Sequence, residues 1–239
     1  MAGRRKSGGR KSDGQQGGSR MTFERVKTAR GRKLSSTLWL QRQLNDPYVQ
    51  AAQRDGYRSR AAYKLLQIDE RFELLRPGLR VVDLGAAPGG WTQVVVDQLQ
   101  PDEHDRNIVA IDILEMEPMA GVQVLQGDIE DADAVAELHG AIGGLVDLVI
   151  SDMATSTTGH ASTDHLRTMT LAEAAFAFAC EVLAPHGAFV TKLFQGADEP
   201  QLFKALQGRF EKVRRFKPKA SRADSVELFH VATGFKGAE

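Results

Sequence analysis

A glycine-rich turn follows an apolar segment in the stretch VVDLGAAPGGWTQ, residues 81–93. Glycines stand at 85, 89 and 90, and the residues from Trp91 onward fit the first turns of a helix. A strand, a tight turn and a helix N-terminus leave backbone N–H groups unpaired and allow the main chain to approach a ligand. The spacing is neither G-x-G-x-x-G nor a Walker motif, and the turn lacks a lysine for a phosphate chain. The pattern favours a nucleoside cofactor without a polyphosphate, the alternative being a tight turn with no ligand.

Polar side chains also stand at the ends of the predicted strands. They are Asp83, Asp112, Asp128, Asp152 and Lys192. An acid about thirty residues after the turn suits the two hydroxyls of a ribose, and the acid after the third strand suits an adenine amino group. Because the carboxyl ends of parallel strands meet at one edge of a sheet, we expect these groups to converge there. Any single acid at a strand end is equally well explained as a loop cap.

Strands and helices must alternate to place these residues. The predicted strands are 80–84, 107–112, 122–126, 146–151 and 188–193, and the predicted helices are 36–44, 59–75, 91–98, 132–139, 165–183 and 200–207. Two closing strands at 210–216 and 226–233 have only a loop between them. The alternation predicts an α/β fold with a mostly parallel, doubly wound sheet covered on both faces, and the closing pair predicts an antiparallel edge. We expect a single domain over residues 36–239.

The net charge of zero conceals an uneven distribution. Residues 1–33 hold eleven Lys and Arg against two acids, and eight Lys and Arg lie between 204 and 222 with one acid. We predict a disordered basic tail over residues 1–35 and contact with a polyanion, most simply nucleic acid. The alternative is a solubilising tail and a solvated strand.

Other classes of protein are disfavoured. No apolar stretch is long enough to span a membrane, the single cysteine excludes an internal disulfide, and the six histidines form no metal-ligand pattern. We therefore expect a cytoplasmic protein with no metal and no membrane partner. An NAD-dependent oxidoreductase is a poorer fit, because the glycine spacing is wrong.

Several segments together resemble the FtsJ/RrmJ-type ribosomal RNA 2′-O-ribose methyltransferases. These are GYRSRAAYKL at 56–65, VVDLGAAPGGWTQ at 81–93, VLQGDIED at 124–131, SDMA at 151–154, VTKLFQG at 190–196 and SRADSVELFHVATGF at 221–235. The resemblance runs from about residue 38 to 235. It implies a Rossmann-like class I fold that uses S-adenosylmethionine, with a seven-stranded sheet. It also implies methylation of a uridine in the A-loop of large-subunit ribosomal RNA, on free RNA or on the assembled subunit.

The same resemblance assigns the site. A Lys-Asp-Lys-Glu tetrad falls on Lys64, Asp152, Lys192 and Glu227, and the cofactor residues fall on Gly85, Gly89, Trp91, Asp112, Asp128 and Asp152. The family's Pro-Asn after SDMA is replaced by Thr155-Ser156. The alternatives are an RNA-binding ribosome assembly factor that keeps the fold without turnover, and a 2′-O-methyltransferase of another RNA.

The tetrad makes chemical sense because a ribose hydroxyl is a poor nucleophile. We expect Lys192 to accept the proton of the hydroxyl or to activate the hydroxyl directly. Asp152 would orient Lys192, and Lys64 would supply a second positive charge. Glu227 would hold a lysine in place. A lysine acts as a base only if its pKa falls towards neutrality, through burial or a nearby cation, whereas adjacent carboxylates raise it. The sequence does not decide which influence is larger.

Overall fold

The computed structural model describes residues 34–102, 107–154 and 160–237 of the 239-residue chain. The chain divides into two compact units, Met1–Asn45 and Asp46–Glu239. The first contains α1 (Leu34–Leu44), and all other elements lie in the second. The predicted basic tail, 1–35, lies outside the described residues except for its last two, which begin α1. The domain boundary at residue 36 stays a prediction.

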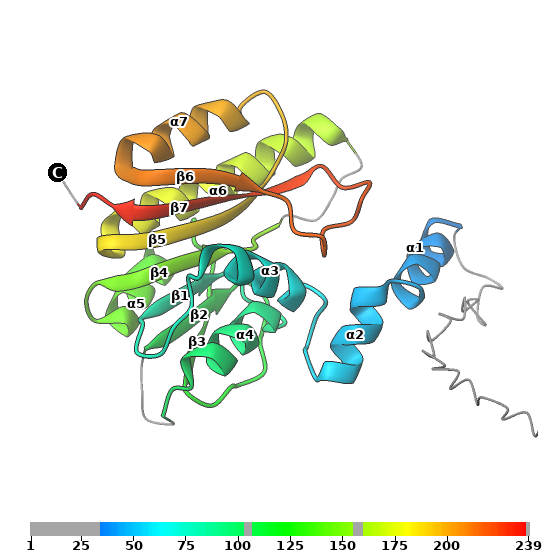
Figure 1. Cartoon of the computed structure of the whole chain (residues 1–239), viewed down its shortest axis with the longest axis horizontal. Helices are drawn as coiled ribbons and strands as arrows, with labels where there is room; N and C mark the ends of the chain where they lie inside the picture. The colour runs from blue at the N-terminus through cyan, green and yellow to red at the C-terminus, as the bar shows by residue number, and fades with distance from the viewer. Residues whose placement is uncertain (1–33, 103–106, 155–159, 238–239) are drawn as a thin grey trace, which may run out of the picture. The chain divides into compact units, whose positions relative to one another are not determined.

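The second unit is built from alternating helices and strands (Figure 1). Its helices are α2 (Pro47–Asp55), α3 (Ala62–Phe72), α4 (Gly90–Leu99), α5 (Ala132–Ile142), α6 (Ala161–Val182) and α7 (Glu199–Arg209). Its strands are β1 (Val81–Leu84), β2 (Ile108–Asp112), β3 (Val122–Gln126), β4 (Val146–Ser151), β5 (Leu183–Phe194), β6 (Phe210–Phe216) and β7 (Glu227–Phe235).

The strands form one seven-stranded sheet in the order β3-β2-β1-β4-β5-β7-β6. β1 to β5 are parallel, and β7 runs antiparallel to both of its neighbours. The predicted doubly wound, mostly parallel sheet is confirmed, with its antiparallel pairing at the predicted edge. The reversed strand is β7, which lies one position in from the outermost strand, β6. Because β7 runs backwards, its first residues lie at the same edge as the carboxyl ends of the parallel strands.

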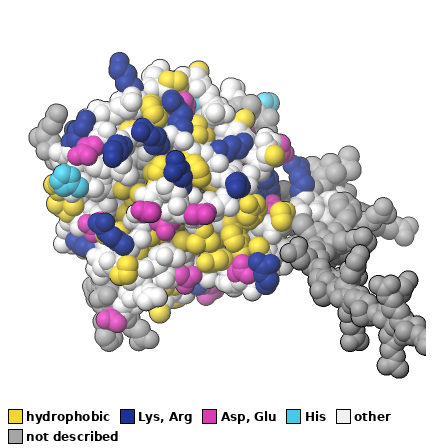
Figure 2. Space-filling view, in the orientation of Figure 1, with side chains coloured by type: hydrophobic (Ala, Val, Ile, Leu, Met, Phe, Trp, Pro, Cys, Tyr) yellow, Lys and Arg dark blue, Asp and Glu magenta, His cyan; other side chains and the backbone are white. Residues whose placement is uncertain are grey.

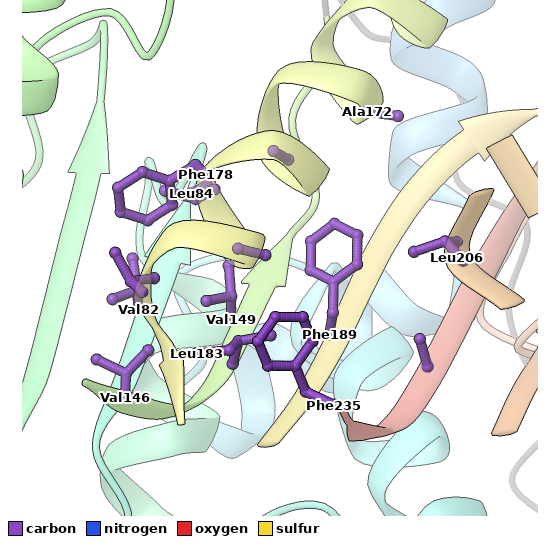
Figure 3. Close-up of a cluster of buried hydrophobic side chains, with 14 of the residues drawn as sticks. Val82, Leu84, Val146, Val149, Ala172, Phe178, Leu183, Phe189, Leu206 and Phe235 are labelled. Atoms are coloured by element: carbon purple, nitrogen blue, oxygen red, sulfur yellow. The ribbon is translucent and has the colours of Figure 1, made fainter. Parts of the chain in front are cut away.

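Alternate residues of the central strands supply two cores, one on each face of the sheet. Val82 of β1 and Phe189 of β5 belong to the core beneath α5, α6 and α7, part of which Figure 3 shows. Val81 of β1 and Val190 of β5 belong to the core beneath α3 and α4. Both faces of the parallel strands are therefore apolar, as a parallel sheet covered by helices requires.

Local signals set several element boundaries. Asp46 caps α2 by accepting a hydrogen bond from the backbone N–H of Tyr48, and Pro47 occupies the first turn, where no N–H donor is needed. Gly56 ends that helix in the left-handed conformation.

Among the described residues, no helix is long and apolar enough to cross a membrane.

A buried polar cluster fastens α7 to the β6–β7 edge. The side chain of Glu199 lies 2.5 Å from Nε2 of the fully buried His230 and accepts a 2.6 Å hydrogen bond from Nε of Arg215. The Arg215 guanidinium stacks 3.7 Å from the centroid of the Phe203 ring. Burial would raise the pKa of Glu199, but Arg215 and His230 outweigh it and the pKa is lowered. The carboxylate is thus held ionised against one face of the sheet.

Phe189→Ala should lower the free energy of unfolding by about 3–5 kcal/mol, since the ring is fully buried on a central strand and its loss leaves a cavity. Leu145→Ala, at a half-exposed position before β4, is the matched control and should change stability by less than about 0.5 kcal/mol. Chemical denaturation measures both values. Equal effects would show that the core does not depend on Phe189.

Candidate active site

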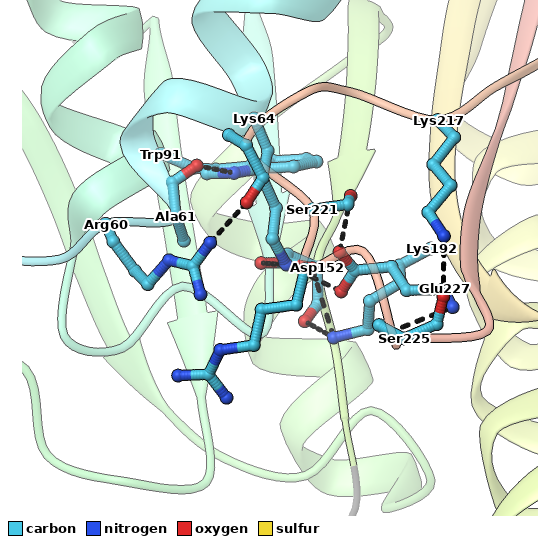
Figure 4. Close-up of polar contacts among 12 residues, drawn as sticks. Arg60, Ala61, Lys64, Trp91, Asp152, Lys192, Lys217, Ser221, Ser225 and Glu227 are labelled. Carbon is cyan, nitrogen blue, oxygen red and sulfur yellow. Dashed lines mark hydrogen bonds and ion pairs between the residues drawn. The ribbon is translucent and has the colours of Figure 1, made fainter. Parts of the chain in front are cut away.

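Four charged side chains from four separate elements meet at the carboxyl edge of the sheet (Figure 4). Lys64 lies in the first turn of α3, Asp152 directly follows β4, Lys192 lies near the end of β5, and Glu227 begins β7. Lys64 Nζ lies 2.7 Å from Glu227 Oε2 and 3.4 Å from Asp152 Oδ2. Lys192 Nζ lies 3.1 Å from Asp152 Oδ1 and donates a 2.5 Å hydrogen bond to the Asp152 carbonyl. The structure thus brings all four tetrad residues together.

The two lysines differ in how the site affects their pKa. Burial lowers the pKa of Lys192, and the positive charge of Lys64 lowers it further; together they outweigh Asp152, so the pKa lies below its ordinary value. Burial also disfavours the charged form of Lys64, but Asp152 and Glu227 outweigh it and the pKa of Lys64 is raised. Lys192 therefore loses its proton more readily than Lys64 does.

Asp152 remains ionised between the two lysines. Burial would raise the pKa of its carboxyl, but Lys192 and then Lys64 outweigh that cost and the pKa is lowered. With two cations and two carboxylates the cluster is close to neutral, which a largely buried site requires.

The loop between β6 and β7 orients Glu227. Ser221 Oγ donates a 2.7 Å hydrogen bond to Glu227 Oε1, and the backbone N–H of Glu227 donates to Ser225 Oγ at 3.1 Å. The loop is in turn tied to α3 and the segment before it, because Gln67 accepts from the backbone N–H of Ala220 and Arg60 donates to its carbonyl. Ser221 therefore holds one carboxylate oxygen of Glu227, and Lys64 holds the other.

Trp91 supports the start of α3. Its ring is 2% exposed, its Nε1 donates a 2.8 Å hydrogen bond to the carbonyl of Ala61, and its centroid lies 5.7 Å from that of Phe229. Lys64 Nζ lies 5.6 Å from the same Phe229 ring. Trp91 is not among the side chains that line the cavity described next. Its contacts fix the helix that carries Lys64.

A cavity of about 530 Å³ opens beside the tetrad, over the ends of β1, β2, β3 and β4. Gly85, Asp112, Asp128 and Asp152 line it, together with apolar side chains such as Met153. The exposed side chains of Ile113 and Leu114 also line it, and each is more than 60% exposed. A pocket of this size, with apolar walls and a few carboxylates, suits a nucleoside-sized ligand. Asp152 alone belongs to both the cavity and the tetrad.

Two of the three predicted cofactor carboxylates, Asp112 and Asp128, are arranged by backbone N–H groups. Asp112 accepts from Ala87 at 2.9 Å and from Leu114 at 2.8 Å, one bond on each oxygen, and Asp128 accepts from Glu130 at 3.0 Å. A carboxylate has about four lone-pair positions, so each can still accept a hydrogen bond from a ligand. These contacts fix the direction in which the carboxylates face the cavity.

Of the two glycines predicted to touch the cofactor, Gly85 is required by close packing and by its backbone conformation, and Gly89 mainly by its backbone conformation. A Cβ at Gly85 would lie 2.4 Å from Met153 Cγ, and one at Gly89 would lie 2.8 Å from Arg58 Nη1. Both have positive φ, 74° and 106°, which also favours glycine. Gly85 lines the cavity, whereas Gly89 is buried against Arg58, which donates to the carbonyls of the segment after β2.

Asp83 is a buried carboxyl beneath this turn. Its Oδ2 accepts a 2.7 Å hydrogen bond from Thr92, and its Oδ1 is buried without a partner among the described residues. Burial raises the pKa of Asp83 to about 7, and the negative charges of Asp152 and Asp112 add to that effect.

Among the described residues, no group of three His, Cys, Asp or Glu is placed to hold a metal ion.

Ser221, Ser225 and Phe229 contact tetrad residues, although the sequence analysis does not single them out. All three lie within six residues of Glu227, inside the segment 221–235 that carries the resemblance. Their proximity to a predicted site residue was the available signal. Which of them contact Glu227 depends on the path of the loop, which no periodicity encodes.

The strand order, the reversed β7 and a cavity over the carboxyl ends of β1 and β2 define the class I S-adenosylmethionine-dependent methyltransferase fold. Comparison with known families then places the chain within this class. The family model described as FtsJ-like methyltransferase matches residues 57–235, and the chain belongs to that family.

Curated relatives agree with this assignment. The chain is 57% identical to a protein named Ribosomal RNA large subunit methyltransferase E from Paramagnetospirillum magneticum, over 99% of this chain and 98% of the relative. It is 58% identical to a protein of the same name from Rhodospirillum rubrum, over 92% and 84%. A solved structure of a candidate ribosomal RNA methyltransferase from Plasmodium falciparum is 29% identical, with a TM-score of 0.66, over 76% of this chain and all of the other.

Asp83→Asn should remove a pH-dependent part of the stability. The pKa of Asp83 rises from about 3.9 in the unfolded chain to about 7, so its contribution is full below pH 4 and is lost as the pH rises through 7. Relative to Asp83→Asn, the native protein should lose about 4 kcal/mol of unfolding free energy between pH 4 and 7. Asp133→Asn, an exposed carboxylate on α5, controls for the loss of one charge. Parallel curves for the native protein and Asp83→Asn would contradict the shift.

Proposed function

We propose that this protein transfers a methyl group from S-adenosylmethionine to a ribose 2′-hydroxyl of large-subunit ribosomal RNA. The observation that carries the proposal is the position of Asp152, which lines the cavity and contacts both lysines of the tetrad. The names of the curated relatives support the RNA class. The resemblance further suggests a uridine in the A-loop as the target.

The cavity residues fit S-adenosylmethionine. Asp112 and Asp128 would accept hydrogen bonds from its ribose and adenine, and the apolar walls at Ile113 and Met153 would contact its flat and aliphatic parts. When bound, the cofactor supplies an electrophilic methyl group on a positively charged sulfur. A cavity rich in carboxylates favours such a cation.

Lys192 is the group that takes the proton from the attacking hydroxyl. Its pKa is already lowered by burial and by Lys64, so the neutral amine forms at lower pH than in a free lysine. Its hydrogen bond to the Asp152 carbonyl fixes the direction of the amine. Proton transfer to a positioned group of this kind contributes about 10²–10⁴-fold to the rate.

Lys64 acts as a fixed positive charge. Its raised pKa keeps it protonated, and the 2.7 Å contact with Glu227 holds its position. From there it lowers the pKa of Lys192 and stabilises negative charge as it develops on the ribose oxygen. The negative charges of Glu227 and Asp152 offset the cost of burying two lysines close together.

Lys192→Arg should reduce kcat by about 10²–10⁴-fold while S-adenosylmethionine still binds, because an arginine keeps the charge but cannot accept a proton near neutral pH. Calorimetric titration measures the binding and tritium transfer measures the rate. Near-native turnover by Lys192→Arg would remove Lys192 from the role of base.

Lys64→Met tests the electrostatic part of the mechanism through the pH profile. In the native protein, the rate should rise with pH until Lys192 becomes neutral. Without the positive charge of Lys64 the pKa of Lys192 rises, so the profile should move to higher pH. A lower rate with an unmoved profile would show that Lys64 only supports the structure.

The substrate is tested with tritiated S-adenosylmethionine and large ribosomal subunits from cells that lack the enzyme. We expect label at one nucleotide, with the adjacent phosphodiester resistant to alkaline cleavage. Label at a base, or cofactor binding without transfer to subunits or free RNA, would overturn the proposal. The second result would favour an RNA-binding assembly factor.

A further inference from the structure

The basic cluster between residues 204 and 222 does not form one surface. Two of its eight cations form ion pairs, Arg215 with Glu199 and Arg222 with Asp46. Three more donate to backbone carbonyls: Arg209 to Gly237, Lys217 to Ser225 and Arg214 to Val213. Lys212 and Arg214 point to the other face of β6 from Arg215, and within the described residues neither has an ion pair. Both are exposed.

These two cations line a groove between β6, β7 and the end of α3. The groove has a volume of about 190 Å³ and is lined by Arg71, Phe72, Lys212, Arg214, Val231 and Thr233. Arg71 is also exposed and has no ion pair among the described residues. Figure 2 shows Lys and Arg side chains gathered over the part of this face where β6 and β7 lie in Figure 1. The groove thus carries three positive charges with no carboxylate among its lining residues.

An aromatic side chain lies within this charged groove. Phe72 is half-buried, and its ring meets that of Phe216 edge-on with centroids 5.5 Å apart. Cations around an aromatic ring suit a single-stranded nucleic acid, whose phosphates need positive charge and whose bases or sugars need a flat apolar surface. A simple anion would use the charges but not the ring.

Two elements, α3 and β7, carry residues of both the groove and the tetrad. Arg71 lies seven residues after Lys64 on α3, a rise of about 10 Å. β7 begins at Glu227 and reaches the groove at Val231 and Thr233. A rise of about 10 Å corresponds to about three steps of a stacked strand. A strand with its ribose at Lys192 would therefore reach the groove within a few nucleotides.

We infer that the groove formed by Arg71, Phe72, Lys212 and Arg214 binds the phosphates of the RNA strand that carries the target nucleotide. The inference rests on the proposed function, because it takes RNA as the substrate. It assigns RNA binding to the face of β6 that carries Lys212 and Arg214. It excludes Arg215, which is ion-paired with Glu199 on the other face. Each cation that neutralises a phosphate releases counterions, so its contribution must weaken as salt rises.

The test compares Lys212→Gln, Arg214→Gln and Arg71→Gln, singly and combined, with Lys204→Gln as the matched control. Lys204 is an exposed lysine on α7, which covers the opposite face of the sheet. The probe is an in vitro transcribed fragment of large-subunit ribosomal RNA, with filter binding measured across a salt series. S-adenosylmethionine binding and methylation of ribosomal subunits are measured in parallel on every variant.

Each single groove variant should weaken RNA binding about fivefold at 0.1 M salt, and the triple variant about 100-fold. The salt slope of the triple variant should become less steep by about 2, while cofactor binding stays unchanged. Groove variants that bind like Lys204→Gln would overturn the inference and leave these cations as solubilising charges. Phe72→Leu separates the aromatic contact, since it should weaken binding without changing the salt slope.

Failure of the inference and failure of the proposed function are distinguishable. If the native protein methylates subunits and the triple variant does so equally well at low substrate concentration, only the groove is wrong. If the native protein binds the RNA through the groove but transfers no methyl group, the catalytic proposal is wrong and the groove stands.

Discussion

The Asp152 carboxylate, placed between two buried lysines, is the interaction on which the site depends. Lys64 and Lys192 lie on different elements, and among the described residues only this carboxylate contacts both of them. Without it, two like charges would face each other in a place largely removed from water, where their repulsion is strong. Asp152 favours the charged form of both lysines, but burial and Lys64 outweigh it at Lys192, whereas Asp152 and Glu227 together outweigh burial at Lys64. The two amines therefore differ chemically although they share one carboxylate.

The rest of the fold can be understood as support for that arrangement. β4 and β5 place Asp152 and Lys192 on adjacent strands, while Trp91 fixes the helix that carries Lys64. The β6–β7 loop holds Glu227 through Ser221 and Ser225. The hydrogen bonds of Trp91, Ser221 and Ser225 are all buried or half-buried, and they come from segments far apart in the sequence. The geometry of the tetrad is thus fixed by its neighbours as much as by its own ion pairs.

Much of the fold could be predicted from the sequence because its signals are local. The bounds of β3, β4 and β6 match the prediction, since each is a short apolar or alternating run between turn residues. β5 is longer than predicted, because Leu183 pairs with β4 despite the Pro-His-Gly that follows. α3 is shorter, since Glu73 ends it in a left-handed conformation that no proline or glycine signals.

The site shows the opposite balance. Lys64 and Glu227, 163 residues apart, form one ion pair, and no spacing or periodicity in the sequence predicts that contact. The resemblance supplied the residue types, while the structure supplies the distances and the direction of each pKa. The groove at Arg71 and Lys212 could not be predicted from the sequence for the same reason, because its residues come from separate elements. Its charges look like part of one basic run until the register of β6 separates Arg214 from Arg215.

The position of β7 also determines when the site can exist during synthesis. β6 is made before β7, yet β7 is its only partner among the described strands, so β6 has no strand to pair with until β7 has been made. The same segment brings Glu227, the carboxylate that compensates Lys64. A nascent chain therefore carries an unpaired basic strand and an incomplete site until β7 has been made. The edge of the sheet and the tetrad are completed in the same folding step.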